Sequence, residues 1–349
     1  MTTTETLVRP APEAQTREPS KLMKAILCPR YGPPDVLQLK EVEKPVPVEG
    51  RVLVKIHAAS ANPADYHPMR GAFMIRVIAR SGLRRPKDPR FGTDIAGRVE
   101  AIGNNVTQFQ PGDEVFGVCP GAFAEYGSAR EDRLALKPAN ISFEHAAAIP
   151  IAALTALQAL RDKGHIKSGQ KVLVNGAGGG VGTFAVQIAK SFGTEVTGVT
   201  STQNLDMVRS IGADRVIDYT KEDFTRTGER YDLICDNAAM HSISDYKRAL
   251  NPNGTCVIVG FRDKIIRRLL YFAIRGRLFS RGDKKVVFFI AKITPNDLVF
   301  MKDLIEAGKV VPVIDRRYPL RETAQAIRYL EEGHARGKVI ITMVHSSHT

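Results

Sequence analysis

The residues most suggestive of chemistry are five glycines within a stretch of eight. Residues 175–182 read Asn-Gly-Ala-Gly-Gly-Gly-Val-Gly and follow the apolar segment 172–174, which is typical of a short buried strand. Residues 183–190 then carry apolar side chains at helical spacing. A strand, a glycine turn and a helix predict a dinucleotide site, because backbone amides and a helix N-terminus can approach a pyrophosphate there. The alternative is a turn that binds nothing.

The end of the next expected strand, residues 194–200, indicates which nicotinamide cofactor is bound. An Asp or Glu at this position would bind the ribose 2′-hydroxyl of NADH. The chain instead has neutral residues at 200–204, which read Thr-Ser-Thr-Gln-Asn. Hydroxyls and amides can donate hydrogen bonds to a 2′-phosphate, whereas a carboxylate would repel it. The sequence therefore favours NADPH; the alternative is a polar strand end that faces water.

Length and cysteine content define the broad class of the protein. A chain of 349 residues predicts two domains with a large core. The cysteines are far apart and form no C-x-x-C pair, which predicts neither a disulfide framework nor a zinc knuckle; they are Cys28, Cys119, Cys235 and Cys256. We therefore expect a reducing, cytoplasmic compartment. Residues 1–20 are polar and contain three prolines, which predicts a disordered tail rather than a targeting peptide.

The net charge of +13 is concentrated in two segments. Residues 70–90 hold seven basic residues against one acidic residue, and residues 262–292 hold ten against two. In residues 264–275 apolar side chains fall on one helical face and basic side chains on the other, which suits peripheral contact with an anionic membrane. The alternative is a pair of helices that cover the substrate cleft. No aromatic platform or recognition motif favours nucleic acid.

The rest of the chain divides into a region of short β segments and a region in which helices and strands alternate. Before residue 140, short β segments and glycine turns predict a twisted, barrel-like β domain, with a turn over residues 59–66. Residues 145–160 are rich in alanine and leucine and predict a helix that Pro150 interrupts. From residue 171 to 260 strands alternate with helices, which predicts a parallel doubly wound sheet. Helices over 297–307 and 318–331 and a strand over 338–343 complete the prediction.

These motifs, in this order, resemble the medium-chain dehydrogenase/reductase superfamily, in its zinc-free quinone oxidoreductase branch. The resemblance extends over about residues 23–344, and its motifs are residues 31–37, 58–65, 92–97, 111–117, 177–182, 212–219 and 333–338. Within the branch it is similar to the reticulon-interacting mitochondrial and chloroplast-envelope oxidoreductases. The resemblance implies an α/β fold. A chaperonin-10-like β domain (21–145 and 310–349) would contain an inserted Rossmann NADP-binding domain (146–309), and the chain would form a homodimer.

The resemblance also implies which residues hold the cofactor. Those at the pyrophosphate are Gly178, Gly179, Gly180, Val181 and Gly182. Those at the 2′-phosphate end are Ser201, Asn204 and Tyr219, although many quinone reductases have Lys in place of Asn204. The remaining cofactor residues are Thr155, Asn237, Gly260, Phe261, His334, Ala335 and Arg336.

No metal is expected. The zinc-dependent members use a Cys, a His-Glu pair and a further Cys or His, and the matching positions here carry Asn62, Thr93-Asp94 and Ile151. Soft thiolate and imidazole ligands are therefore missing. A divergent zinc site formed by His57, His67 and Cys119 is the alternative, but its spacing matches no known pattern.

Catalysis without a metal must orient the acceptor and stabilise negative charge on its oxygen. Asn62 could donate through its amide, and Tyr66 or His67 could donate a hydrogen bond or a proton. The alternatives are structural, since Asn62 precedes a proline and Tyr66 could simply pack. We expect an NADPH-dependent oxidoreductase acting on a quinone or another activated enone or enal. The alternatives are a zinc-free alcohol or aldehyde dehydrogenase and a non-catalytic NADPH-binding adaptor at a membrane.

Overall fold

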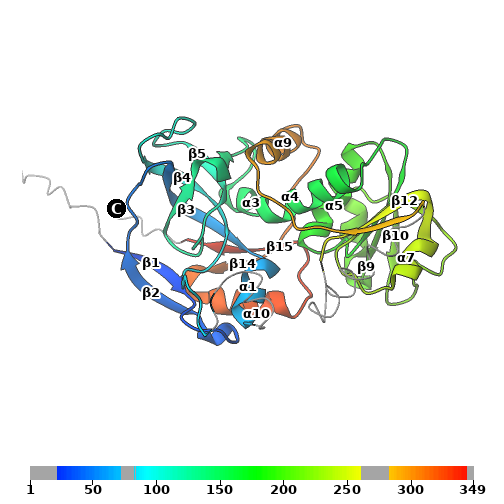
Figure 1. The fold of residues 1–349 in the computed structure, drawn as a ribbon, viewed down its shortest axis with the longest axis horizontal. Coiled ribbons are helices and arrows are strands. Elements are labelled where there is room, and N and C mark those ends of the chain that lie inside the picture. Colours follow the sequence, from blue (N-terminus) through cyan, green and yellow to red (C-terminus); the bar gives the residue numbers. More distant parts are fainter. Residues whose placement is uncertain (1–21, 72–81, 83, 261–282, 344–349) are drawn as a thin grey trace, which may run out of the picture.

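The protein contains two large β-sheets that lie side by side along its long axis (Figure 1). The computed structural model describes residues 22–71, 82, 84–260 and 283–343. The predicted tail over residues 1–20, the amphipathic segment 264–275 and Phe261 lie outside the described residues. In the described part of the chain, no helix is both long and apolar enough to cross a membrane.

The first sheet has seven strands in the order β14-β15-β3-β4-β5-β7, with β6 paired to β3. The strands in chain order are β3 (Arg51–Ala61), β4 (Asp94–Ile102), β5 (Glu114–Val118), β6 (Tyr126–Arg130), β7 (Leu134–Leu136), β14 (Ile314–Pro319) and β15 (Lys338–Thr342). A separate antiparallel pair is formed by β1 (Leu22–Leu27) and β2 (Gln38–Glu43). This sheet encloses an apolar core and corresponds to the predicted β domain.

The second sheet has six parallel strands in the order β10-β9-β8-β11-β12-β13. They are β8 (Lys171–Asn175), β9 (Glu195–Thr200), β10 (Arg215–Asp218), β11 (Tyr231–Asp236), β12 (Leu250–Ile258) and β13 (Lys285–Phe288). Its helices include α5 (Gly180–Ser191), α6 (Leu205–Ser210) and α7 (Ile243–Ala249). This strand order is that of doubly wound dinucleotide-binding sheets, and it confirms the predicted α/β class.

The helices α3 (Phe143–Ala147) and α4 (Pro150–Gln158) lie before β8 in the chain, and α9 (Pro295–Glu306) follows β13. Pro150 begins α4, which follows the short α3, so the predicted interruption at this proline is confirmed. The helix α9 packs against α4. Just after α4, the partly exposed Arg161 forms an ion pair with the buried Asp297 of α9, with an N–O distance of 2.7 Å.

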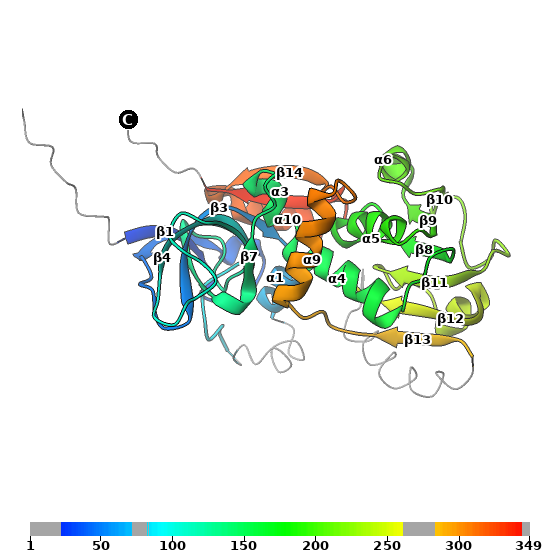
Figure 2. The ribbon, with the colours of Figure 1, turned by 90° about the horizontal axis from the view of Figure 1, so that it is seen from above.

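The C-terminal segment returns to the first sheet (red in Figure 2). The helix α10 (Thr323–Glu331) connects β14 to β15, which pair in parallel. The strand β15 then pairs antiparallel with the end of β3, where Val339 opposes Ala61. This pairing places Lys338, the first residue of β15, beside the residues that follow β3.

Two sequence predictions are wrong at their boundaries. The turn expected over residues 59–66 consists of the end of β3 and the helix α1 (Pro63–Arg70), which a capping box between Asn62 and Asp65 begins. The helix expected to start at residue 318 starts at Thr323, because residues 314–319 form β14. The strand β13 was not expected and has only four residues, and β14 was missed because three of its six residues are charged.

We predict that Gly182→Ala destabilises the fold more than Gly179→Ala does. A Cβ on Gly182 would lie 2.1 Å from the carbonyl oxygen of Gly176, whereas a Cβ on Gly179 would approach that oxygen only to 3.6 Å. Overpacking of this kind costs about 1–3 kcal/mol of unfolding free energy. Urea denaturation of both variants measures the difference, and an equal loss in the two would contradict the steric argument.

Candidate active site

The glycine turn between β8 and α5 brings its backbone close to the end of β9. Gly176 has φ +74°, and the amide of Gly179 donates to its carbonyl oxygen at 3.1 Å. A Cβ on Gly178 would lie 2.7 Å from Oγ1 of Thr200. Gly179 has no side chain with which to cap α5, so the first amides of that helix, from Gly180 onward, are suited to an anion.

A loop from the C-terminal segment lies against this turn. We call residues 333–337 the C-terminal glycine loop; it contains His334, Ala335 and Arg336. The amide of Gly337 donates to the carbonyl oxygen of Gly178 at 3.0 Å. The Arg336 guanidinium reaches the end of β9, where Nη2 donates to Oε1 of Gln203 at 2.7 Å. The fold thus brings the two predicted cofactor segments together.

Buried polar atoms near the turn are consistent with a bound dinucleotide. Nδ2 of Asn204 donates to Oγ of Ser201 at 3.3 Å, and Nδ2 of Asn237 donates to the carbonyl oxygen of Asn175 at 2.9 Å. The Oδ1 atoms of both Asn204 and Asn237 are buried and accept no hydrogen bond within the described structure. Such acceptors usually have a partner, and a cofactor could supply one.

Three further predicted cofactor residues occupy the surroundings. The amide of Tyr219, after β10, donates to the carbonyl oxygen of Thr200 at 3.0 Å. A Cβ on Gly260 would lie 3.0 Å from the carbonyl oxygen of Asn237. The Thr155 hydroxyl donates to the carbonyl oxygen of Ile151 at 2.6 Å, which is a bond within α4.

A buried polar cluster lies between the glycine turn and the first sheet. It comprises Ser60, Asn62, Asp65, Thr93, Asp94 and Lys338. The ammonium Nζ of Lys338 donates to Oδ1 of Asn62 at 2.5 Å and lies 3.8 Å from Oδ2 of Asp94. A Cβ on Gly180 would lie 3.1 Å from Cδ of Lys338, so the lysine stem runs directly beside the start of α5.

All polar atoms of the Asn62 side chain are hydrogen-bonded within the polar cluster. Its Nδ2 donates to Oδ2 of Asp94 at 2.9 Å and to the carbonyl oxygen of Ser60 at 3.2 Å, while its Oδ1 accepts from Lys338. The residue is 2% exposed. Both amide hydrogens therefore point at protein acceptors, and the geometry supports a positioning role for Asn62 rather than direct donation to a substrate.

The cluster holds two carboxyl groups and one ammonium group. Asp94 also accepts from the amide of Ile151 at 3.2 Å. Asp65 accepts from the amide of Asn62 and from the hydroxyl of Thr93, both at 2.8 Å. Burial raises the pKa of Asp94 and lowers the pKa of Lys338. Burial also raises the pKa of Asp65 to about 7, despite the hydrogen bond from Thr93.

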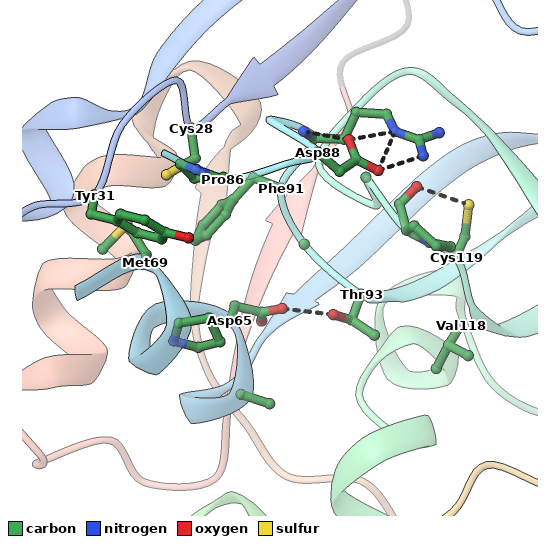
Figure 3. Close-up of a pocket in the computed structure, with 16 residues that line it drawn as sticks. Cys28, Tyr31, Asp65, Met69, Pro86, Asp88, Phe91, Thr93, Val118 and Cys119 are labelled. Carbon is green, nitrogen blue, oxygen red and sulfur yellow. Dashed lines mark hydrogen bonds and ion pairs between the residues drawn. The ribbon is translucent and has the colours of Figure 1, made fainter. Parts of the chain in front are cut away.

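A cavity of about 380 Å³ opens on the other side of Asp65 (Figure 3). Its apolar wall includes Met69, Phe91 and Val118, and Asp65 and Thr93 contribute polar groups. The remaining lining residues are Cys28, Tyr31, Ala64, Pro68, Pro86, Asp88, Arg90, Gly92, Cys119, Pro120 and Gly121. The polar cluster thus connects this cavity to the glycine turn.

Tyr66 and His67 lie on α1 beside Asp65 but do not line the cavity. Their rings contact each other, with centroids 4.3 Å apart. Burial raises the pKa of Tyr66, with the nearby Glu331 acting in the same direction, and burial lowers the pKa of His67. Both side chains are thus placed toward α10.

The residues at the family's zinc positions do come together, but they do not fit a metal ion. Asn62, Asp94 and the amide of Ile151 are connected by hydrogen bonds, and the cation among them is the ammonium of Lys338. An ammonium and a metal cation cannot share these acceptors. Among the residues with described positions, no three His, Cys, Asp or Glu side chains are arranged to hold a metal ion.

Sequence reasoning missed the central groups of this site. Lys338 was considered only as the end of a motif and the start of a strand, and Asp65 only as part of a turn; neither was assigned a chemical role. A usable signal did exist, because Asp94 and Lys338 each begin a strand whose next residues are apolar and buried. Charged residues in buried strands are usually paired, so they could have been expected to meet.

Comparison with known proteins places the chain among oxidoreductases. Residues 48–139 match the family model for the alcohol dehydrogenase GroES-like domain, and residues 211–341 match that for zinc-binding dehydrogenase. A chloroplastic quinone-oxidoreductase homolog from Spinacia oleracea is 36% identical, over 92% of this chain and 99% of its own length. A chloroplastic NADPH-dependent alkenal/one oxidoreductase from Arabidopsis thaliana is 33% identical, over 92% of this chain and 80% of its own length.

Solved structures agree with this result. The quinone oxidoreductase from Coxiella burnetii superposes with a TM-score of 0.80 at 30% sequence identity, over 92% of this chain and 99% of that chain. The similarity therefore extends over nearly the whole chain.

We predict that Lys338→Met lowers the unfolding free energy by about 3–5 kcal/mol, because it leaves a buried carboxylate without its cation. The double variant Asp94→Asn/Lys338→Met removes both charges and should regain most of the loss. The matched control Lys302→Met breaks a partly exposed pair with Glu306 and should cost less than about 1 kcal/mol. Chemical denaturation measures all three, and additive losses in the double variant would contradict the pairing.

Proposed function

We propose that this chain, which belongs to the quinone oxidoreductase-like branch of the medium-chain dehydrogenase/reductase superfamily, is an NADPH-dependent reductase. Its acceptors are quinones or conjugated enones and enals, and it needs no metal. The observation that carries the proposal is the polar cluster, which joins a dinucleotide-type glycine turn to an apolar cavity. NADPH, when bound, supplies the hydride. The protein supplies orientation, exclusion of water and charge stabilisation.

The preference for NADPH is supported by charge at the end of β9. Residues there are neutral, and the guanidinium of Arg336 reaches Gln203 at 2.7 Å. A guanidinium is a strong partner for a phosphate group. The carboxylate of Asp218 is nearby, but it accepts from the hydroxyls of Thr202 and Thr220. The cation of Arg336 is therefore well placed for a 2′-phosphate.

The acceptor class is supported by the cavity. Its aromatic, thioether and proline side chains suit a flat apolar molecule, and Asp65 and Thr93 supply polar groups for a carbonyl oxygen. The relatives named for quinones and for alkenals favour this reading over an alcohol or aldehyde dehydrogenase. The internal ammonium of Lys338 supports metal independence, because it supplies the cluster's positive charge.

Several expectations stay predictions. These are the homodimer, the peripheral membrane contact, the cytoplasmic location and the domain boundaries at residues 145 and 310. Two of the relatives are named as chloroplastic proteins, so their location gives no support for a cytoplasmic one.

The proposed reaction can be tested directly. Purified protein treated with a chelator should oxidise NADPH in the presence of quinones and enones and should be slower with saturated aldehydes. Absorbance of NADPH measures the rate across the acceptor panel. Activity that appears only after zinc is added, or with aldehydes alone, would contradict the proposal.

The proposed cofactor preference can be tested by substitution. Ser201→Asp and Arg336→Gln should each weaken NADPH binding about tenfold or more while changing NADH binding little, because each acts on the 2′-phosphate; tenfold corresponds to about 1.4 kcal/mol. Arg328→Gln is a matched control, since Arg328 makes an exposed pair with Asp35. Fluorescence titration gives both affinities, and equal weakening of NADPH and NADH would contradict the assignment.

A further inference from the structure

We propose that Asp65 stores the proton that the reduction consumes and that the hydroxyl of Thr93 delivers it from Asp65 to the oxygen of the acceptor. This inference rests on the proposed function and adds a catalytic acid that the sequence did not reveal. It is carried by the position of these two side chains, which belong both to the polar cluster and to the wall of the cavity.

Asp65 and Thr93 form a short chain of groups that can exchange a proton. Oδ1 of Asp65 and Oγ1 of Thr93 are 2.8 Å apart, and the two side chains point toward each other at the cavity wall (Figure 3). Asp65 is only 6% exposed, whereas Thr93 is partly exposed. When Asp65 is protonated, this hydrogen bond reverses: the carboxyl O–H donates to Thr93, and the Thr93 hydroxyl can then donate its own hydrogen to a molecule in the cavity. Thr93 can therefore connect the buried carboxyl group to a molecule in the cavity.

The charge balance of the polar cluster favours a protonated Asp65. The cluster has one ammonium for two carboxyl groups, and Lys338 lies within 3.8 Å of Asp94. Asp65 forms no ion pair with a described residue, and the hydrogen bonds that it accepts from the amide of Asn62 and the hydroxyl of Thr93 only partly oppose the rise in its pKa. The carboxylate of Asp94 also raises the pKa of Asp65, although burial is the larger cause, and Lys338 opposes the rise.

Several other ionisable groups around Asp65 either form an ion pair with each other or have a pKa that burial shifts. Burial raises the pKa of Cys28 to about 11 and the pKa of Cys119 to about 12. Asp88 and Arg90, on the opposite wall, are paired with each other at 2.5 Å. Burial lowers the pKa of His67 below its usual range. The remaining ionisable residues beside Asp65 or on the cavity wall are Tyr31, Tyr66, Asp94 and Lys338.

The proposed step balances in atoms and electrons. For an enone, the hydride that NADPH supplies forms a C–H bond at the β-carbon, and the electron pair of the C=C bond shifts so that the carbonyl oxygen becomes negative. The Thr93 O–H bond breaks toward that oxygen, and Thr93 takes the proton of Asp65. The product leaves as an enol that becomes the saturated ketone. Solvent then returns one proton to Asp65.

The pH profile of kcat/KM for a water-soluble enone tests the proposal. Because only protonated Asp65 is active, the wild-type rate should fall as pH rises through about 7, by a factor of ten per unit at higher pH. Asp65→Asn should be slower at pH 6 by on the order of 100-fold and should lack this fall. Thr93→Val should be similarly slow, whereas Thr93→Ser should retain most of the rate. An Asp65→Asn enzyme that keeps the wild-type fall would overturn the proposal.

Two controls separate a chemical role from a structural one. Asp297→Asn removes another buried aspartate, one that forms an ion pair with Arg161 at 2.7 Å and does not line the cavity, and it should leave the fall near pH 7 in place. Thermal unfolding shows whether each variant is folded. Asp65→Asn can keep both hydrogen bonds, with its oxygen accepting from the Asn62 amide and its nitrogen donating to Thr93.

A measurement without substrate tests the stored proton directly. Infrared difference spectra of the cofactor-free wild type against Asp65→Asn should show a protonated-carboxyl band that disappears as pH rises through about 7. A carboxylate spectrum at pH 6 would overturn the proposal. If none of the quinones or enones supports NADPH oxidation by the wild type, the proposed function fails, but the infrared result still decides the state of Asp65.

Discussion

The structure depends on the burial of one ammonium group, that of Lys338, among the polar side chains that join the first sheet to the glycine turn. Lys338 is 3% exposed, and its stem runs beside Gly180 before its charge reaches Asn62 and Asp94. A buried charge is tolerated only when its partners are held in good geometry. The three chain segments that supply these groups must therefore meet, and this requirement couples the cofactor turn to the first sheet.

The return of the chain to the first sheet satisfies this requirement. Antiparallel pairing of β15 with the end of β3 sets Lys338 beside Asn62, and pairing of β3 with β4 sets Asp94 beside Ser60. The same return carries the C-terminal glycine loop onto the glycine turn, where Gly337 donates to Gly178. Cofactor binding, charge compensation and the cavity wall thus arise from one set of strand pairings.

Much of the fold could be predicted from local patterns. The glycine turn, the alternation after residue 171 and the break at Pro150 are local, and the structure agrees with each. The strands β13 and β14 could not be found in this way, since β13 has only four residues and three of the six residues of β14 are charged. The site has a different limit. The cofactor segments carry recognisable spacing, but Asp65 and Lys338 are 273 positions apart and gain their roles only through β-sheet pairing.

The central claim is that this protein transfers a hydride from NADPH to a conjugated carbonyl compound without a metal. The most direct measurement uses NADPH carrying deuterium on the transferred position at C4, with protein from which metal has been removed and verified by elemental analysis. We predict that the reduced enone contains one deuterium at its β-carbon. An unlabelled product, or no product until zinc is restored, would contradict the account.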